Sequence, residues 1–182
     1  MSIYLDAAQR YLPLRDRIKA LIIAESPPYH GEGERPRYFY FNELTGKEYL
    51  FRNIMRVILP GELAIAERTK DKVPALRFFC DKLNFFLIDA CDYPINNLST
   101  RFRIKEIEKG LTALVERVEG LVSKTTPIIL IKRSTLGVVQ AELSDRGYFL
   151  CRPRPLAFPT YGNQNKFRLE FREALRVVGG IL

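Results

Sequence analysis

The sequence predicts a single α/β domain over residues 1–182, built as a three-layer α/β/α sandwich around a central, mostly parallel, four-stranded sheet. This prediction rests on four short apolar runs bounded by turn residues: KALIIAE (19–25), LNFFLIDAC (83–91), TPIILIK (126–132) and RGYFLCR (146–152). Unbroken apolar runs are typical of parallel strands that are buried on both faces. Helical patterns separate the runs, and 182 residues suffice for one domain with a sizeable core.

The clearest helical pattern covers residues 101–124. Its apolar side chains recur every three or four positions and form one stripe that we expect to pack on the sheet. The stripe consists of Ile104, Ile107, Leu111, Leu114, Val115, Val118 and Leu121. A second helix is predicted between the third and fourth runs, with Ser134 as its N-cap and Gly147 at its end.

The remaining helices are predicted from shorter patterns. Residues 47–59 and 73–83 are expected to form two helices in the long connection between the first two strands. Residues 162–180 predict a terminal helix capped by Asn163 or Asn165. Near the N-terminus, Pro13 limits the first helix, which is expected as one short helix or two.

Composition restricts the class of protein. With 47% hydrophobic residues, the chain has neither a fibrous nor a disordered composition. Its longest apolar runs are far shorter than the roughly 18 residues of a membrane-spanning helix, and its first residues lack the pattern of a signal peptide. We therefore expect a cytoplasmic protein without a membrane partner.

The cysteines give no basis for a metal or cofactor site. Cys80, Cys91 and Cys151 are widely spaced, with no Cys-x-x-Cys pair, and the chain contains 1 histidine. This pattern favours buried free thiols over a disulfide framework, a zinc site or an iron–sulfur cluster. We expect neither a metal nor a cofactor.

The positive charge lies mainly in the C-terminal half of the chain. The formal net charge is +8, and residues 101–182 carry 15 basic against 8 acidic side chains. A basic surface attracts polyanions, of which nucleic acid is the commonest in the cytosol. The alternative is a solvated basic face that aids solubility.

Parallel sheets bind ligands outside the carboxyl ends of their strands, so functional residues are expected directly after the apolar runs. The first run is followed by ESPPYHGEGERPRYFYF (25–41). Pro27 and Pro28 stiffen this loop, which either presses against a flat ligand or simply ends the strand. His30 is a candidate catalytic base, with loop packing as the alternative.

Three segments resemble, in order, the motifs of the uracil-DNA glycosylase superfamily. IIAESPPYHGEG (22–33) resembles the first motif, where a strand leads into a proline-containing loop that encloses a flipped base. FFLIDACDYPIN (85–96) resembles the strand whose last polar residue reads the base edge. LAFPTYGNQNKF (156–167) resembles the loop that opens the final helix and contacts the DNA backbone. The resemblance spans about residues 18–178 and implies the fold of that superfamily.

The resemblance also implies a base-binding site. Glu25 and Pro27 fit the first motif, and Ser26 stands where the best-known branch has the Asp that orients the attacking water. Asp89 fits the position that reads the base. Because an ionised carboxylate only accepts hydrogen bonds, Asp89 suits a base edge with two donors unless it is protonated or caps backbone. The aromatic on which the base stacks is expected to be Tyr38, Phe39 or Tyr40, which otherwise form an alternating strand against the core.

Basic and loop residues are expected to contact nucleic acid at the pocket mouth. They are Arg35, Arg37, Arg152, Arg154, Pro159, Thr160, Tyr161, Gly162, Asn163 and Lys166. The chain departs from the superfamily at two further places. Phe158 or Ala157 replaces the histidine that supports the leaving base, and the cluster ligands of the four-cysteine branch are absent.

The function implied by the resemblance is base excision from DNA, by hydrolysis of the N-glycosidic bond of a damaged or deaminated base. A carboxylate beneath the sugar stabilises the oxocarbenium-like state, and Glu25 is the expected carboxylate, with Ser26 and His30 beside it. Two alternatives stay open. One is an inactive superfamily member that binds nucleic acid or a nucleotide, and the other is a small-molecule hydrolase or nucleotide-sensing domain.

Overall fold

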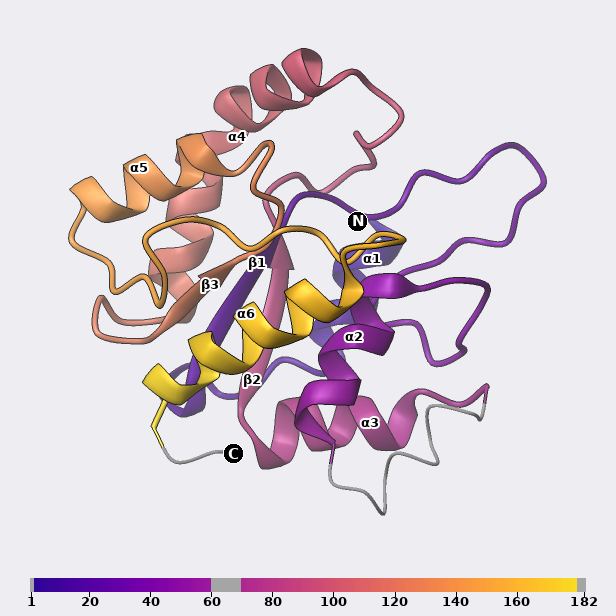
Figure 1. Cartoon of the computed structure of the whole chain (residues 1–182), viewed down its shortest axis with the longest axis horizontal. Helices are drawn as coiled ribbons and strands as arrows, with labels where there is room; N and C mark the ends of the chain where they lie inside the picture. Colours follow the sequence, from indigo (N-terminus) through magenta and orange to yellow (C-terminus); the bar gives the residue numbers. More distant parts are fainter. Residues whose placement is uncertain (1, 60–69, 180–182) are drawn as a thin grey trace.

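The structure, a computed structural model, describes residues 2–59 and 70–179 and is of the mixed α/β class (Figure 1). Its small open sheet has three parallel strands, with β1 (Ala20–Ala24) between β2 (Phe85–Asp89) and β3 (Ile128–Leu130). Every residue of the three strands is buried. The α/β class and the parallel pairing expected from the apolar runs are therefore confirmed.

The helices occur at the predicted places in the chain. The first strand is preceded by α1 (Ile3–Gln9) and the 3-10 turn η1 (Arg15–Arg17). The connection from β1 to β2 contains α2 (Tyr49–Ile58), α3 (Val73–Arg77) and the π-helical turn η3 (Phe78–Lys82). The connection from β2 to β3 is α4 (Thr100–Leu121), and α5 (Gly137–Asp145) and α6 (Gln164–Val177) follow. None of the helices in the described ranges has the length and apolar character needed to cross a bilayer.

Two helix pairs position the elements around the sheet. Helix α2 packs against α6, and α4 packs against α5. Figure 1 shows α2 and α6 in front of the strands and α4 behind them. The predicted apolar stripe of α4 is buried at Ile107, Leu114, Val115 and Val118.

The fourth apolar run does not form a strand among the described residues. Leu150 of this run meets β3 in a single parallel bridge with Ile128, and Leu156, beyond the run, forms another with Ile131, the residue after β3. Between these bridges the chain bends at Arg152-Pro153-Arg154-Pro155. Because proline has no N–H to donate to a ladder, this stretch cannot pair continuously with β3.

Helix α5 ends where the sequence predicts but begins at a different residue. Ser134 lies in a turn, and the helix begins at Gly137 after an N-cap residue, Leu136, whose side chain makes no capping hydrogen bond. The predicted stop is confirmed, since Gly147 has φ +78°, a conformation that favours glycine. Turn geometry, rather than the Ser134 hydroxyl, sets the start.

The Tyr38–Phe41 stretch is a turn, which excludes the alternating strand considered for it. Tyr40 is 1% exposed, and its hydroxyl both donates to the Leu87 carbonyl at 3.0 Å and accepts from the Leu87 N–H at 2.7 Å. Leu87 lies in β2, an outer strand of the sheet. The tyrosine hydroxyl thus satisfies backbone groups that a further strand would otherwise pair.

Substitution of Tyr40 by Phe is expected to lower the free energy of unfolding by about 2 to 6 kcal/mol. The change leaves a buried N–H and a buried carbonyl of Leu87 without partners, and each unsatisfied group costs about 1 to 3 kcal/mol. Urea denaturation measures the effect. Tyr29→Phe, at a side chain that is 48% exposed, is the matched control and should change stability by less than about 0.5 kcal/mol. Equal effects of the two substitutions would show that the Tyr40 hydroxyl does not stabilise the edge of β2.

Candidate functional site

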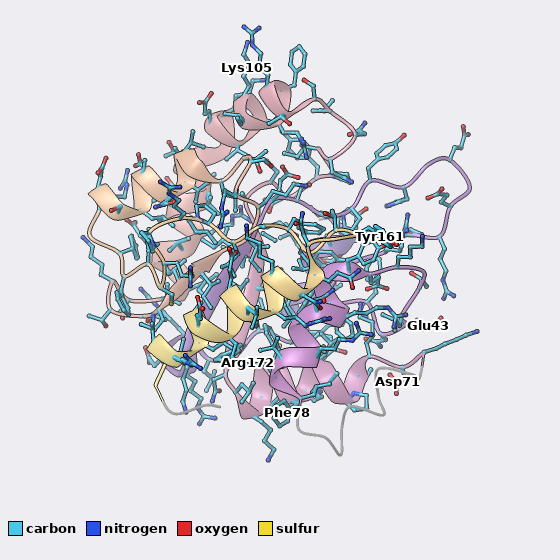
Figure 2. All side chains as sticks on the ribbon, viewed as in Figure 1. Glu43, Asp71, Phe78, Lys105, Tyr161 and Arg172 are labelled. Atoms are coloured by element: carbon cyan, nitrogen blue, oxygen red, sulfur yellow. The ribbon has the colours of Figure 1, made fainter. Side chains whose placement is uncertain are left out.

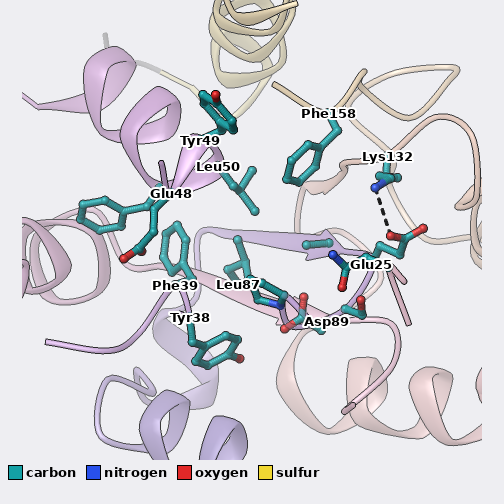
Figure 3. A pocket seen from close by; sticks show the side chains of 15 residues that line it. Glu25, Tyr38, Phe39, Glu48, Tyr49, Leu50, Leu87, Asp89, Lys132 and Phe158 are labelled. Atoms are coloured by element: carbon teal, nitrogen blue, oxygen red, sulfur yellow. Dashed lines mark ion pairs between the residues drawn. The ribbon is translucent and has the colours of Figure 1, made fainter. Parts of the chain in front are cut away.

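A pocket of about 150 Å³ opens at the carboxyl ends of the strands (Figure 3). Its lining comes from the loop after β1, the end of β2, the residue after Ile131, the start of α2 and the loop before α6. The residues that carry its chemistry are Glu25, Tyr38, Phe39, Asp89, Lys132 and Phe158. Segments that are far apart in the sequence therefore meet at one edge of the sheet, as the parallel topology predicts.

The parallel register brings Glu25 and Lys132 together. Ile23 of β1 pairs with Leu130 of β3. Two residues after each of these positions, Glu25 and Lys132 are therefore neighbours. Lys132 Nζ lies 3.1 Å from a Glu25 oxygen, an ion pair drawn in Figure 3. The Glu25 side chain is only 5% exposed.

A second cation reaches the same carboxylate from α4. Arg103 Nη1 lies 3.3 Å from Glu25 Oε2 and 3.4 Å from Oε1, and its Nη2 donates to the Thr100 hydroxyl. Glu25, Arg103 and Lys132 form what we call the Glu25 triad. One carboxylate thus faces two cations in a largely buried setting, which leaves a net positive charge beside the pocket.

The backbone at Lys132 is strained. Its φ is +117°, a region that residues with a side chain rarely adopt. The amides of Lys132 and Arg133 both donate to the Leu156 carbonyl, which holds this conformation. The ammonium also lies 4.8 Å from the centre of the Phe158 ring. Strained residues cluster at functional sites, so Lys132 is a candidate functional residue.

The opposite side of the pocket is aromatic. Figure 3 shows Tyr38 and Phe39 across from Glu25 and Lys132. Phe39 packs edge-to-face on Phe51 and Phe79, with ring centres 5.5 and 5.3 Å apart. This packing fixes the ring against the core, so the pocket presents a rigid apolar wall.

A buried ion pair anchors that wall. Lys72 Nζ donates to the Tyr38 carbonyl at 2.7 Å and to Glu48 Oε2 at 2.6 Å, and it lies over the Phe51 ring. Glu48 also accepts the Thr45 N–H. Burial lowers the pKa of Lys72 to about 8, and the neighbouring Glu48 carboxylate opposes this change. The turn that carries Tyr38 and Phe39 therefore depends on a pair of charges removed from water.

Asp89 is the second acidic residue of the pocket. Burial raises the pKa of its carboxyl group to about 7, while a hydrogen bond from Tyr38 and the charge of Arg117 act in the opposite direction. Its Oδ2 is buried and has no hydrogen-bond partner among the described residues. At and below neutral pH a substantial part of Asp89 is therefore the neutral acid, which has a donor as well as an acceptor.

Polar residues tie the proline loop to the chain that follows β2. The Ser26 hydroxyl donates to the Pro27 carbonyl and accepts the Ile95 N–H, and Asn96 Oδ1 accepts the Tyr29 N–H at 2.6 Å. Ser26 and Asn96 both line the pocket. These bonds hold one rim of the pocket in place.

Three of the predicted catalytic and base-binding residues do not line this pocket. Pro27 is buried and lines a cavity beside α1, whereas Pro28 borders the pocket. His30 packs on the proline loop, with one ring nitrogen 3.1 Å from the Pro28 carbonyl and the other 3.5 Å from the Tyr4 hydroxyl. Tyr40 lies in the core, as described above. Among the three aromatics considered for base stacking, Tyr38 and Phe39 are thus the ones that line the pocket.

The predicted nucleic-acid contacts lie outside the pocket. Arg35, Arg37 and Arg152 form ion pairs with Glu43, Glu34 and Glu173 respectively. Pro159 is buried, and Asn163 caps α6 by position without a side-chain hydrogen bond. The remaining residues are exposed: Arg154, Thr160, Tyr161, Gly162 and Lys166.

Sequence reasoning missed Lys132, Arg103, Glu48 and Asn96. The sequence does contain a signal for Lys132, because this residue stands at the end of the third apolar run just as Glu25 stands at the end of the first. Arg103 and Glu48 had none, since their roles depend on how α4 and the start of α2 approach the sheet. Asn96 lies in the segment FFLIDACDYPIN (85–96), but its pattern does not distinguish this amide from the residues around it.

Comparisons of the chain with protein-family models, with curated proteins and with solved structures found no match. The resemblance to the uracil-DNA glycosylase superfamily therefore rests on the three sequence segments.

Asp89 is expected to make stability depend on pH. Its folded-state pKa of about 7 exceeds the ordinary value of 3.8, so between these values the native state holds a proton that the unfolded chain has released. The contribution of Asp89 to the free energy of unfolding is thus fully present below about pH 4 and falls as the pH rises to about 7. From pH 5 to pH 7 the free energy of unfolding of the wild type should fall by about 2 to 3 kcal/mol more than that of Asp89→Asn.

Urea denaturation at both pH values measures this loss. Asp145→Asn, at an exposed carboxyl group at the end of α5, is the control and should follow the wild type. An Asp89→Asn variant with the same pH dependence as wild type would show that Asp89 is ionised in the folded protein.

Substitution of Lys72 by Met should lower the free energy of unfolding by about 3 to 5 kcal/mol, because it leaves the Glu48 carboxylate buried and unpaired. Adding Glu48→Gln should recover most of this loss. Lys109→Met, which removes an exposed partner of Glu106, is the control and should cost less than about 1 kcal/mol. Denaturant titration measures the free energy of unfolding of the wild type, the two single variants and the double variant. A double variant as unstable as Lys72→Met would contradict the pairing.

Proposed function

We propose that the pocket binds a base of nucleic acid and positions its N-glycosidic bond for hydrolysis, as a divergent member of the uracil-DNA glycosylase superfamily. The supporting observation is that the motif residues Glu25, Asp89 and Tyr38-Phe39 line one pocket at the carboxyl ends of the strands. At about 150 Å³ it is smaller than the roughly 300–1,000 Å³ of pockets for drug-sized ligands, which suits a single planar base. The three-layer arrangement belongs to the same proposal, supported by α2 and α6 in front of the sheet and α4 behind it.

Glu25 is the proposed catalytic carboxylate. Water adds to C1′ of the sugar as the bond between C1′ and the base nitrogen breaks, the bonding electrons leave with the base, and the proton of the water ends on the base. The transition state carries positive charge on the sugar, which a nearby carboxylate stabilises. Arg103 and Lys132 hold Glu25 in position, and Ser26 beside it adds a hydroxyl that can hold water.

Asp89 is the proposed reader of the base edge. A neutral carboxylic acid presents an acceptor and a donor side by side, which complements a ring N–H next to a carbonyl. Uracil and hypoxanthine carry this pair, whereas the ionised form would suit an edge with two donors. Phe39 and Tyr38 supply the apolar surface for the face of the base, while His30 acts from the loop as a support for Pro28.

A second candidate function is binding without hydrolysis, by an inactive member of the same superfamily. The observation that favours it is that both oxygens of Glu25 face cations, so the carboxylate is already engaged in ion pairs. In this case the pocket holds a base or nucleotide, and Arg154, Lys166 and the loop 159–163 contact phosphate.

Excision is tested by abasic-site formation on oligonucleotides that carry uracil, hypoxanthine, xanthine or a mispaired base. The proposal expects product from at least one substrate with wild-type protein and a loss of at least about 100-fold with Glu25→Gln, the scale of one catalytic group. Glu173→Gln, at an exposed carboxylate on α6, is the control. If no substrate yields product while thermal melting shows stabilisation by a free base or nucleotide, the binding function replaces excision.

A further inference from the structure

Exposed aromatic side chains are concentrated near the pocket, on segments that the proposed function does not use. Tyr29, Tyr93 and Phe102 are each 48% to 58% exposed, and together with the aliphatic Leu98, which is 38% exposed, we call them the aromatic rim. They lie on the proline loop, on the chain after β2 and on the first turn of α4. Large apolar side chains gathered at one edge are typical of a binding surface.

Backbone hydrogen bonds and chain neighbours join the rim to the pocket. The Tyr29 N–H is bonded to Asn96, which lines the pocket, and Leu98 N–H donates to the carbonyl of Ile95, the residue before Asn96. Phe102 precedes Arg103 of the Glu25 triad. The Tyr93 hydroxyl donates to Glu106 on α4, which fixes the ring, and this bond together with burial raises the pKa of Tyr93 to about 12.

The segment that carries Leu98 and Phe102 is basic. Residues 98–105, LSTRFRIK, contain three basic side chains and no acidic one. Arg103 pairs with Glu25, whereas Arg101 and Lys105 form no ion pair with any residue that the structure describes. Figure 1 shows the first turns of α4 projecting beyond the ends of the strands, and Figure 2 shows Lys105 pointing outward from them.

We propose that the aromatic rim binds single-stranded nucleic acid next to the pocket, with bases stacked on Phe102 and Tyr93 and phosphates neutralised by Arg101 and Lys105. Rings and cations on one surface match the two components of a single strand, whose base faces are open for stacking. A duplex hides those faces and offers mainly phosphates to such a surface. This inference rests on the proposed function, since it defines the strand that would deliver the base.

Fluorescence anisotropy with a labelled single-stranded oligonucleotide and the matched duplex tests the inference. We expect tighter binding of the single strand, and a loss of at least about fivefold with Phe102→Ala, the lower end of what one lost base–ring stack costs. Phe149→Ala is the matched control, because Phe149 is 42% exposed but bonded through its backbone to the first residue of β3, at the opposite edge. It should leave affinity unchanged.

The cations are tested by the dependence of affinity on salt. Arg101→Gln and Lys105→Gln should each reduce the slope of log affinity against log salt by about 0.7, the value for one phosphate contact on a single strand. Lys124→Gln, at an exposed lysine near Phe149, is the control and should leave the slope unchanged.

Several results would overturn the inference: equal or tighter binding of the duplex, no binding of either oligonucleotide, or identical losses with Phe102→Ala and Phe149→Ala. Loss of self-association or of vesicle binding in Phe102→Ala, without any oligonucleotide binding, would assign the rim to a protein or membrane instead. Failure of the proposed function is read separately. If Glu25→Gln abolishes excision while Phe102→Ala binds the oligonucleotide normally, the catalytic pocket is supported and the rim is not. If binding depends on the rim but no base is excised, the rim is supported and the catalytic pocket is not.

Discussion

The Glu25 carboxylate joins three elements at the site, because Lys132 follows β3, Arg103 belongs to α4, and Glu25 itself follows β1. Removing three charged groups from water costs free energy that their mutual attraction only partly returns. A hydrophobic contact would have joined the same elements more simply. Stability alone therefore does not explain the triad, and the strained backbone of Lys132 also marks this edge as a candidate functional site.

The pocket lies between two buried sets of charges. The Glu25 triad stands on one side, and the Lys72–Glu48 pair supports the aromatic turn on the other. Apolar side chains such as Phe39, Leu87 and Phe158 line the pocket between them. In such a low-dielectric setting each charge acts more strongly on a bound group than it would in water. Small movements of the aromatic turn would therefore change both the shape and the electrostatics of the pocket.

The sequence predicts the class of fold well, because buried parallel strands and amphipathic helices leave periodic patterns that are read locally. It predicts Glu25 and Asp89 as pocket residues for the same reason, since each directly follows or ends an apolar run. It overestimates the sheet by one strand, because the prolines at 153 and 155 interrupt pairing after an apolar run that otherwise suits a strand. Arg103 and Lys72 act through contacts with residues far away in the chain, and no local pattern reports such contacts.

The hydroxyl of Tyr40 also has a consequence between molecules. An outer strand with free N–H and carbonyl groups is a template on which the strand of another chain can add, and this route leads to aggregation. At Leu87 the outer edge of β2 is already saturated by a side chain, and at β3 the chain around Leu150 and Leu156 occupies the corresponding positions. At these positions the two edges of the three-stranded sheet offer no free backbone groups on which a strand of another chain could add.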